Sequence, residues 1–367
     1  MDAGALAPRE AALLWSAATG GPWPDPSGLE GDARFMAMAL AAAQEGVGLA
    51  SPNPPVGCVI VSGGRVIGTG THLRAGGPHA EVAALADAEA RGETAQGATA
   101  YVTLEPCCHQ GRTPPCTAAL LKAGLARVVV GVRDPNPRVD GGGIALLRHR
   151  GVRVTVGVLG PSCAAFHAPF FKLIGTGLPW VSFILDPGDR PPPVKHIGQA
   201  VRRCAEAVVI GRRTAEVRDP SLRDGWPVPA PPHRLLRRVV LDAGASLDPF
   251  RRVWRPLDHQ PVLRATLDAA LPLQGVEDLR PGPGPNGLSL DGLLRNLAAR
   301  GAGRVLFEGG GDLARSLLAL DLVDEFHRFR REGPAVPLFK DPVLRWAGRT
   351  RLRVAIPGGT WEVLNRP

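Results

Sequence analysis

The stretch GGPHAEVAAL places His79 two residues before Glu81, at the expected start of a helix. Downstream, the segment LEPCCHQGRTPPC carries Cys107 and Cys116. Zinc accepts imidazole nitrogen and thiolate sulfur in tetrahedral sites, and a catalytic zinc keeps one position open, so three protein ligands suffice. If both cysteines lie at the start of the next helix, the three side chains converge at neighbouring helix N-termini, whose partial positive charge favours thiolates. The spacing therefore predicts a zinc site formed by His79, Cys107 and Cys116.

Glu81 is predicted to act beside the metal rather than on it. Two residues that are two positions apart on a helix diverge by about 200° around its axis, so Glu81 cannot easily share a metal ion with His79. A carboxylate near a zinc-activated water can instead take its proton and pass it to a leaving amine. Zinc deaminases of nucleosides and nucleic acids combine H-x-E with P-C-x-x-C, whereas this chain has P-C-x8-C. We interpret Glu81 as a catalytic proton shuttle.

Simpler interpretations exist for each residue taken alone. A lone His79 is more often a helix-capping or core histidine, and Cys107 alone a small buried hydrophobe. Their joint occurrence in the correct order favours zinc. Cys108 is expected to pack or contact substrate rather than ligate, and Cys58 is expected to lie in the core.

Two α/β domains are expected to position these residues, because single cores rarely grow beyond about 250–300 residues and the chain has 367. Residues 1–30 are rich in Gly and Pro and predict a poorly ordered leader. Helices and strands alternate over residues 31–160, with Asp32 as a possible cap of the first helix, and predict a three-layer α/β domain. The pattern restarts over residues 161–367 and predicts a second α/β domain, although after Glu325 the periodicity is broken.

Composition narrows the function classes. No apolar run approaches the roughly 20 residues that a membrane helix needs, and the first residues lack the pattern of a secretory signal, so we expect no membrane partner and a cytoplasmic location. The net charge of +9 comes almost entirely from scattered arginines, which favours compositional drift over a nucleic-acid partner. The six cysteines are too unevenly spaced for a small disulfide scaffold, which favours metal or catalytic use.

The first region resembles the riboflavin-biosynthesis family RibD, in which a pyrimidine deaminase is fused to a pyrimidine reductase. The matching motifs are PNPPVGCVIV (52–61), GTGTHLRAGGPHAE (68–81), YVTLEPCCHQGRTPPC (101–116) and DPNPRVDGGG (134–143). Cys108 stands where this family usually has Ser. The resemblance implies a cytidine-deaminase-like three-layer αβα domain followed by a dihydrofolate-reductase-like α/β domain, and it favours a homo-oligomer.

The resemblance also implies the chemistry and the binding residues. It implies Zn2+ on His79, Cys107 and Cys116, Glu81 as the proton shuttle, and a small phosphoribosylaminopyrimidine as partner. That substrate is 2,5-diamino-6-(5-phosphoribosylamino)pyrimidin-4(3H)-one, which is deaminated to the 5-aminouracil with release of ammonia. The motif positions implied to bind substrate in this domain are Asn53, His72, His109 and Arg112. For His72 and Arg112, solvation in a loop is the plain alternative.

The second region is similar to the reductase half of the family. AVVIGRRTAEVRDPSLRD (207–224) matches a reductase motif, and VLFEGGGDLARSLLALDLVDE (305–325) matches its cofactor strand and glycine loop. A Gly-rich turn opening a helix can bring backbone N–H groups to a dinucleotide phosphate. The resemblance implies NADPH binding by Thr214, Gly309, Gly310 and Gly311. It implies substrate binding by Arg202, Leu222 and Glu308.

Departures from the family pattern weaken the expectation of reduction. The short DPGDRPPPVKHIG replaces a longer stretch that helps to form the reductase pocket, Arg218 stands where an acidic residue is common, and the tail after Glu325 has lost the usual pattern. Absent binding groups cannot orient a hydride donor against its acceptor. We therefore hypothesise a degenerate reductase domain that is kept for folding or assembly, with NADPH use doubtful and a working reductase as the alternative.

Two other functions compete with this interpretation. A deaminase acting on tRNA or another nucleobase substrate predicts a short Cys-x-x-Cys pair and clustered basic or aromatic residues along a channel. Neither feature is evident, and Tyr101 is the only tyrosine. A non-catalytic zinc-stabilised module would need the ligands but not Glu81.

Overall fold

A computed structural model describes residues 21, 23–111, 113–185, 192–223, 231, 233–257, 260–267, 271–285, 287–331, 349–356 and 359–366. The chain divides into two compact units, one ending at Thr176 and the other containing everything from Gly177 onward. Most of the expected leader lies outside the described residues, and its last part holds a short 3-10 helix, η1 (Pro26–Gly28). Within the described ranges, no helix is both long and apolar enough to cross a membrane.

The first unit is built on a five-stranded mixed sheet with the strand order β2-β1-β3-β4-β5. Its strands are β1 (Gly57–Ser62), β2 (Arg65–Thr71), β3 (Thr99–Leu104), β4 (Arg127–Val132) and β5 (Arg153–Val156). β1 runs antiparallel to β2 and β3, whereas β3, β4 and β5 are parallel. The β1–β2 hairpin turns at Gly63 and Gly64, whose φ values of +56° and +77° favour glycine.

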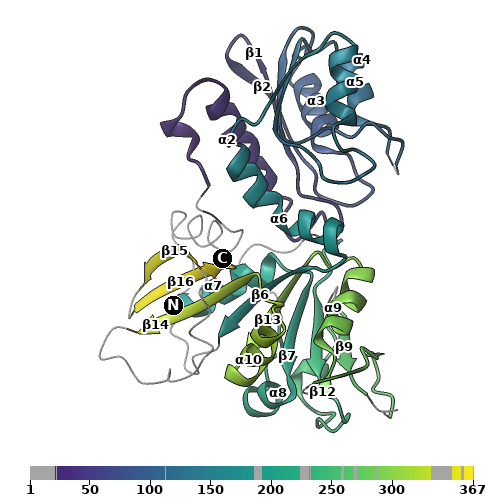
Figure 1. The fold of residues 1–367 in the computed structure, drawn as a ribbon, viewed down its shortest axis with the longest axis vertical. Coiled ribbons are helices and arrows are strands. Elements are labelled where there is room, and N and C mark those ends of the chain that lie inside the picture. The colour runs from purple at the N-terminus through teal and green to yellow at the C-terminus, as the bar shows by residue number, and fades with distance from the viewer. Residues whose placement is uncertain are drawn as a thin grey trace. The chain divides into compact units, whose positions relative to one another are not determined.

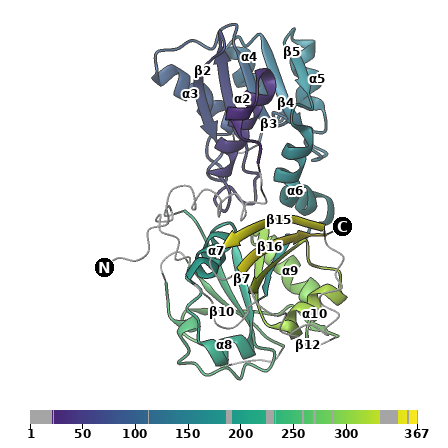
Figure 2. The same cartoon turned by 90° about the vertical axis from the view of Figure 1, so that its left-hand side faces the viewer.

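Helices cover both faces of this sheet and complete the predicted three layers (Figure 1). They are α2 (Gly31–Gln44), α3 (Ala80–Ala90), α4 (Cys116–Lys122), α5 (Gly142–His149) and α6 (Gly160–Thr176). α3, α4 and α5 lie on one face, and α2 and α6 lie on the other (Figure 2). A cluster of buried side chains joins β1–β4 to α3, α4 and α5, including Ile60, Ile67, Ala84, Val102, Leu120, Val130 and Leu147. The sequence placed residues from 161 in the second region, whereas α6 belongs to the first unit.

Glycines in the strands allow the helices to lie very close to the sheet. A Cβ atom on Gly57 would lie 2.0 Å from the Ala39 carbonyl oxygen of α2. A Cβ atom on Gly70 would lie 2.2 Å from the Ala80 carbonyl oxygen of α3. Both separations are far below van der Waals contact, so the packing of α2 and α3 requires the absence of a side chain at these strand positions.

Asp32 does not cap α2, contrary to the expectation from sequence. The cap position is Glu30, and Asp32 lies in the first turn, where its carboxylate accepts hydrogen bonds from Tyr101 Oη at 2.9 Å and from Arg127 Nη1 and Nη2 at 2.8 and 2.6 Å. Hydrogen bonds from Arg127 hold the pKa of the Asp32 carboxyl below its usual value. A bidentate guanidinium is a stronger partner than the backbone N–H groups, so Asp32 ties α2 to β3 and β4.

The second unit contains a nine-stranded sheet with the order β10-β9-β8-β7-β13-β6-β14-β16-β15. Its strands are β6 (Trp180–Leu185), β7 (Ala207–Gly211), β8 (Arg237–Leu241), β9 (Val262–Ala265), β10 (Val276–Leu279), β13 (Arg304–Gly309), β14 (Glu325–Arg331), β15 (Arg349–Ile356) and β16 (Gly359–Asn365). In the order of the sheet, neighbouring strands from β10 through β9, β8, β7, β13 and β6 to β14 are parallel. The pairs β14–β16 and β16–β15 are antiparallel. A separate small hairpin joins β11 (Pro283–Gly284) and β12 (Gly287–Leu288).

The antiparallel edge of this sheet was not resolved from the sequence. The segment after Glu325 lacks a clear period of two, yet β14 and β16 form a regular ladder, and β15 pairs with β16 with one register shift between Thr350 and Leu352. The reason lies in the buried positions, because His327 is 0% exposed and Glu362 is 2% exposed. Polar residues in the core hide the alternation of apolar and polar residues that marks a strand.

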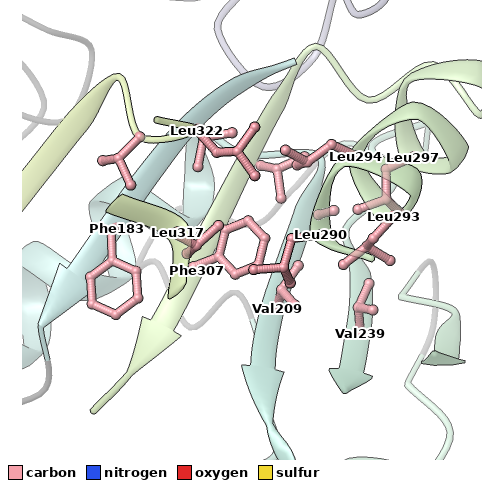
Figure 3. Packing of buried hydrophobic residues seen from close by; sticks show 14 of the residues in the cluster. Phe183, Val209, Val239, Leu290, Leu293, Leu294, Leu297, Phe307, Leu317 and Leu322 are labelled. Carbon is pink, nitrogen blue, oxygen red and sulfur yellow. The ribbon is translucent and has the colours of Figure 1, made fainter. Parts of the chain in front are cut away.

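The core of the second unit lies between the sheet and two helices (Figure 3). The helices of this unit are α7 (Pro192–Arg203), α8 (Arg212–Arg218), α9 (Leu290–Ala299) and α10 (Gly311–Ala319), and a 3-10 helix η2 spans Arg252–Trp254. Leu290, Leu293, Leu294 and Leu297 repeat along one face of α9 and pack on the sheet with Phe183 and Phe307.

Candidate metal centre and second site

The three predicted metal ligands come together in the first unit. His79 is the N-cap residue of α3, and Cys116 is the first residue of α4. Cys107 lies in the loop after β3, not at the start of a helix as expected, but its sulfur accepts the backbone N–H of Cys116 at 3.3 Å. The Cys107 carbonyl accepts the N–H of Thr117 at 3.2 Å, so the loop is fastened to the first turn of α4.

The distances between the ligand atoms fit a single metal ion. His79 Nδ1 lies 3.1 Å from Cys116 Sγ and 3.6 Å from Cys107 Sγ, and the two sulfurs are 3.4 Å apart. A tetrahedral zinc ion with bonds of about 2.3 Å to sulfur and about 2.0 Å to nitrogen places its sulfurs about 3.8 Å apart and its nitrogen about 3.5 Å from each sulfur. The distance from His79 Nδ1 to Cys107 Sγ is close to the expected value, and the other two distances are about 0.4 Å shorter than expected. Small side-chain adjustments would therefore seat the ion.

The electrostatics of the two thiols also suit a cation. Hydrogen bonds from Cys116 and from His79 lower the pKa of Cys107 to about 4, against the opposing effect of burial. The hydrogen bond to this thiolate, together with burial, raises the pKa of Cys116. The surroundings therefore favour the thiolate at Cys107, and Cys116 would have to lose its proton to bind a cation, because metal ligands must be deprotonated.

Thr113 orients the imidazole ligand and was not predicted from the sequence. Its hydroxyl oxygen lies 3.2 Å from His79 Nε2, on the side of the ring opposite the sulfurs. When Nδ1 binds a metal ion, Nε2 carries the ring proton and can donate it to this hydroxyl. Partners of this kind fix the orientation of ligating histidines. The available signal was its position between the two cysteines, in GRTPPC.

Glu81 lies on the second position of α3 and does not join the three ligand atoms, as expected from its angle around the helix. It is 3% exposed, and burial raises the pKa of its carboxyl. Its carboxyl group interacts with the Cys116 side chain, which places it directly beside the metal ligands. A buried carboxyl with a raised pKa is suited to both accepting and giving up a proton near neutral pH.

One implied substrate residue lies against a metal ligand, and a second contacts the first. His72 is buried, and its ring centroid is 5.0 Å from that of His79. Asn53 Nδ2 lies 3.0 Å from His72 Nε2. His109, in the loop after Cys107, has a buried Nδ1 atom without a hydrogen-bond partner among the described residues. Arg112 lies outside the described residues.

A carboxylate that the sequence reasoning missed supports the metal loop. Glu105, two residues before Cys107, accepts the backbone N–H groups of Asp134, Gly141 and Ile144 at 3.3, 3.0 and 3.1 Å. It thereby holds the DPNPRVDGGG segment and the start of α5 against the ligand loop. Burial, with repulsion from Glu105 and Cys107, raises the pKa of Asp134 to about 6.

The second unit brings together Arg202 and Glu308 from α7 and β13. Arg202 Nε and Nη2 donate to Glu308 Oε1 at 2.9 and 2.6 Å, and Arg202 Nη1 donates to the Arg223 carbonyl at 2.7 Å. Leu222 lies in the same loop as Arg223, with a φ of +54° and 2% exposure. The three residues implied to bind the reductase substrate therefore occupy one neighbourhood.

The implied cofactor residues are also adjacent. Gly309 ends β13, Gly310 is the N-cap residue of α10, and Gly311 is its first residue. The Thr214 hydroxyl lies 3.6 Å from the position that a Cβ atom on Gly309 would take. The strand, the glycine turn and the helix thus have the arrangement expected of a phosphate-binding turn.

Comparisons with known proteins agree with both sites. The family model of the cytidine and deoxycytidylate deaminase zinc-binding region matches residues 29–132, and the RibD C-terminal domain matches residues 184–330. The riboflavin biosynthesis protein RibD of Escherichia coli is 36% identical over 317 residues, which are 80% of this chain and 86% of that protein. The chain belongs to the RibD family.

Other RibD relatives extend this agreement. The chloroplastic riboflavin biosynthesis protein PYRD of Arabidopsis thaliana is 50% identical over 151 residues, which cover 41% of this chain and 35% of that protein. A solved structure from Thermotoga maritima, described as a diaminohydroxyphosphoribosylaminopyrimidine deaminase/5-amino-6-(5-phosphoribosylamino)uracil reductase, is 29% identical with a TM-score of 0.78. That match covers 92% of this chain and 99% of the other.

Membership of the RibD family confirms several expectations and removes the support for one. The cytidine-deaminase-like and reductase folds are confirmed, as is a zinc site at His79, Cys107 and Cys116. The hypothesis of a degenerate reductase domain has no support, because the RibD C-terminal model matches residues 184–330, which include the rewritten stretch and Arg218, and the chain carries an NADPH-dependent reductase domain. Arg218 is simply the last residue of α8, and the segment 186–191 lies outside the described residues.

Proposed function

We propose that this chain catalyses two consecutive steps of riboflavin biosynthesis. In the first unit, 2,5-diamino-6-(5-phosphoribosylamino)pyrimidin-4(3H)-one is deaminated hydrolytically to the corresponding 5-aminouracil. In the second unit, the ribosyl side chain of that product is reduced with NADPH. The observation that carries the proposal is the convergence of one imidazole and two thiols within 4.8 Å of one another, with the buried carboxyl of Glu81 beside them.

The deamination depends on proton transfer by Glu81. His79, Cys107 and Cys116 would hold a zinc ion, which would supply Lewis acidity to activate the attacking water. Glu81 accepts a proton from the attacking water and delivers a proton to the amino group that departs as ammonia. Its burial keeps bulk water from competing for that proton, and its raised pKa brings it towards the value at which both transfers are efficient.

The reduction needs a bound cofactor and an oriented sugar. NADPH supplies a hydride when bound. Backbone N–H groups at Gly310 and Gly311, at the start of α10, would receive its phosphates, and Thr214 would lie alongside. Arg202 and Glu308, held together by two hydrogen bonds, would contact the substrate as a pair, and Leu222 would line the same pocket.

A coupled assay tests both halves of the proposal. Purified protein is incubated with the diaminopyrimidine substrate, and ammonia release and NADPH oxidation are followed together. Ammonia should appear without NADPH, and NADPH should be consumed only after deamination. The variant Glu81→Gln should keep its zinc and lose ammonia release, while still oxidising NADPH when given the deaminated product. An unchanged rate of ammonia release in this variant would favour a non-catalytic zinc module.

Assembly and location stay predictions from the sequence. A homo-oligomer and a cytoplasmic location are compatible with the proposed activities but do not carry them. Sedimentation of the purified chain measures the first, and fractionation of cells that express it measures the second.

A further inference from the structure

A chain of hydrogen bonds links Asn53 to the backbone just before the histidine ligand. The Pro78 carbonyl lies 2.8 Å from His72 Nδ1, and Asn53 Nδ2 lies 3.0 Å from His72 Nε2. A carbonyl oxygen can only accept, so Nδ1 carries the ring proton. Nε2 is then the acceptor, and only the nitrogen of the Asn53 amide, not its oxygen, can face it.

This arrangement uses both nitrogens of His72. The ring is 3% exposed and packs edge-on against His79, with ring centroids 5.0 Å apart. No ring nitrogen remains to contact a substrate directly. The Asn53 amide oxygen, in contrast, has no hydrogen-bond partner among the described residues, and the side chain is only partly buried.

We propose that His72 is a positioning residue that fixes the amide of Asn53, so that its oxygen accepts a hydrogen bond from an N–H group of the aminopyrimidine substrate. This inference rests on the proposed deamination. An amide free to rotate by 180° would present its NH2 group half of the time, and a donor facing a donor leaves both unsatisfied. His72 therefore acts on substrate recognition through Asn53, not through contact.

One test is independent of catalysis. The zinc-loaded protein is labelled with 15N in its histidine rings, and the His72 signals are assigned by their loss in His72→Gln. The Nδ1–H tautomer is expected, with an Nε2 shift that changes when Asn53 is replaced by Ala. An Nε2–H tautomer, or an Nε2 signal that Asn53→Ala leaves unmoved, would overturn the proposal.

The second test measures the coupling between the two residues. His72→Leu and Asn53→Ala should each raise KM for the diaminopyrimidine about 10- to 100-fold, the loss expected when one buried hydrogen bond is left unmade. The double variant should be no worse than Asn53→Ala, and His72→Gln, which keeps an acceptor and a donor, should lie closer to the original protein than His72→Leu. Zinc content should stay unchanged throughout.

Multiplicative effects in the double variant would show that His72 acts independently and would refute the proposal. Loss of zinc from His72→Leu would assign the residue to the metal site and refute it as well. If His72→Leu does not fold, the comparison of Asn53→Ala with the original protein, by ring 15N shift and by KM, still decides. Absence of ammonia release from the unaltered protein would defeat the proposed function, whereas the tautomer measurement would still report on the geometry.

Discussion

Replacing Thr113 by Val should weaken zinc binding without removing a ligand. The hydroxyl of Thr113 is the partner of His79 Nε2 at 3.2 Å, and valine keeps the shape of the side chain but cannot accept the N–H. The Nε2 atom of the half-buried ring would lose its partner, and the ring would lose the contact that orients Nδ1 toward the two sulfurs. Loss of such a partner typically lowers metal affinity about 10- to 100-fold, which corresponds to about 1.4–2.7 kcal/mol.

Competition with a chromophoric chelator at fixed pH measures this affinity directly. Thr113→Ser keeps the hydroxyl and should bind zinc nearly as tightly as the original protein. Thr94→Val is a matched control, because the Thr94 hydroxyl accepts only from the exposed backbone N–H of Gln96. Equal zinc affinity in Thr113→Val and Thr113→Ser would refute the idea that this hydroxyl orients the ligand.

Three further changes test the fold around the sites. Gly70→Ala should destabilise the first unit by about 1–3 kcal/mol, because the added Cβ would lie 2.2 Å from a carbonyl oxygen of α3. Gly175→Ala is the control, because its Cβ meets open space and should leave stability unchanged or raise it. Thermal unfolding compares the two variants. Asp32→Asn should cost about 1 kcal/mol at pH 7 in urea unfolding. The pKa of Asp32 is lowered in the folded protein, so its contribution to stability is fully present above the unfolded pKa of about 3.9 and is lost as pH falls through the folded pKa. The difference in unfolding free energy between Asp32→Asn and the original protein should therefore shrink in acid. A difference that stays constant with pH would contradict this. Arg238→Met should lower the unfolding temperature of the second unit, because this fully buried guanidinium donates to four backbone carbonyls; an unchanged melting curve would contradict that role.

The metal ligands were predictable because their types, order and spacing are local features of the chain. The alternation of strands and helices was readable for the same reason, since period and breakers report on neighbouring residues. The partner of Asp32 was not predictable, because Arg127 lies 95 residues away and the local pattern favoured a cap. The role of Thr113 was not predictable, because its hydroxyl contacts the His79 ring only in the folded structure and no local pattern marks this contact.

The reductase half shows a different limit of sequence reasoning. The absence of several family residues was interpreted as loss of the reductase function. The structure nevertheless pairs Arg202 of α7 with Glu308 of β13 through hydrogen bonds. Thr214 lies close to Gly309. Side-chain contacts between segments that are distant in sequence can persist when the residues between those segments are replaced. The buried His327 and Glu362 hid the strand pattern of β14 and β16 in a similar way. Their charged or polar partners, Glu325 for His327 and Arg328 for Glu362, lie within the same sheet.

The tie between Glu105 and the start of α5 has a consequence for how this enzyme could be altered. A side chain at Gly143 would place its first carbon 2.0 Å from the carbonyl oxygen of Pro106, the residue immediately preceding a metal-binding sulfur. Crowding at this helix, which contributes no ligand, would be transmitted through one peptide group to the metal. Engineering that tunes metal retention could therefore begin at residue 143, leaving every coordinating atom as it is.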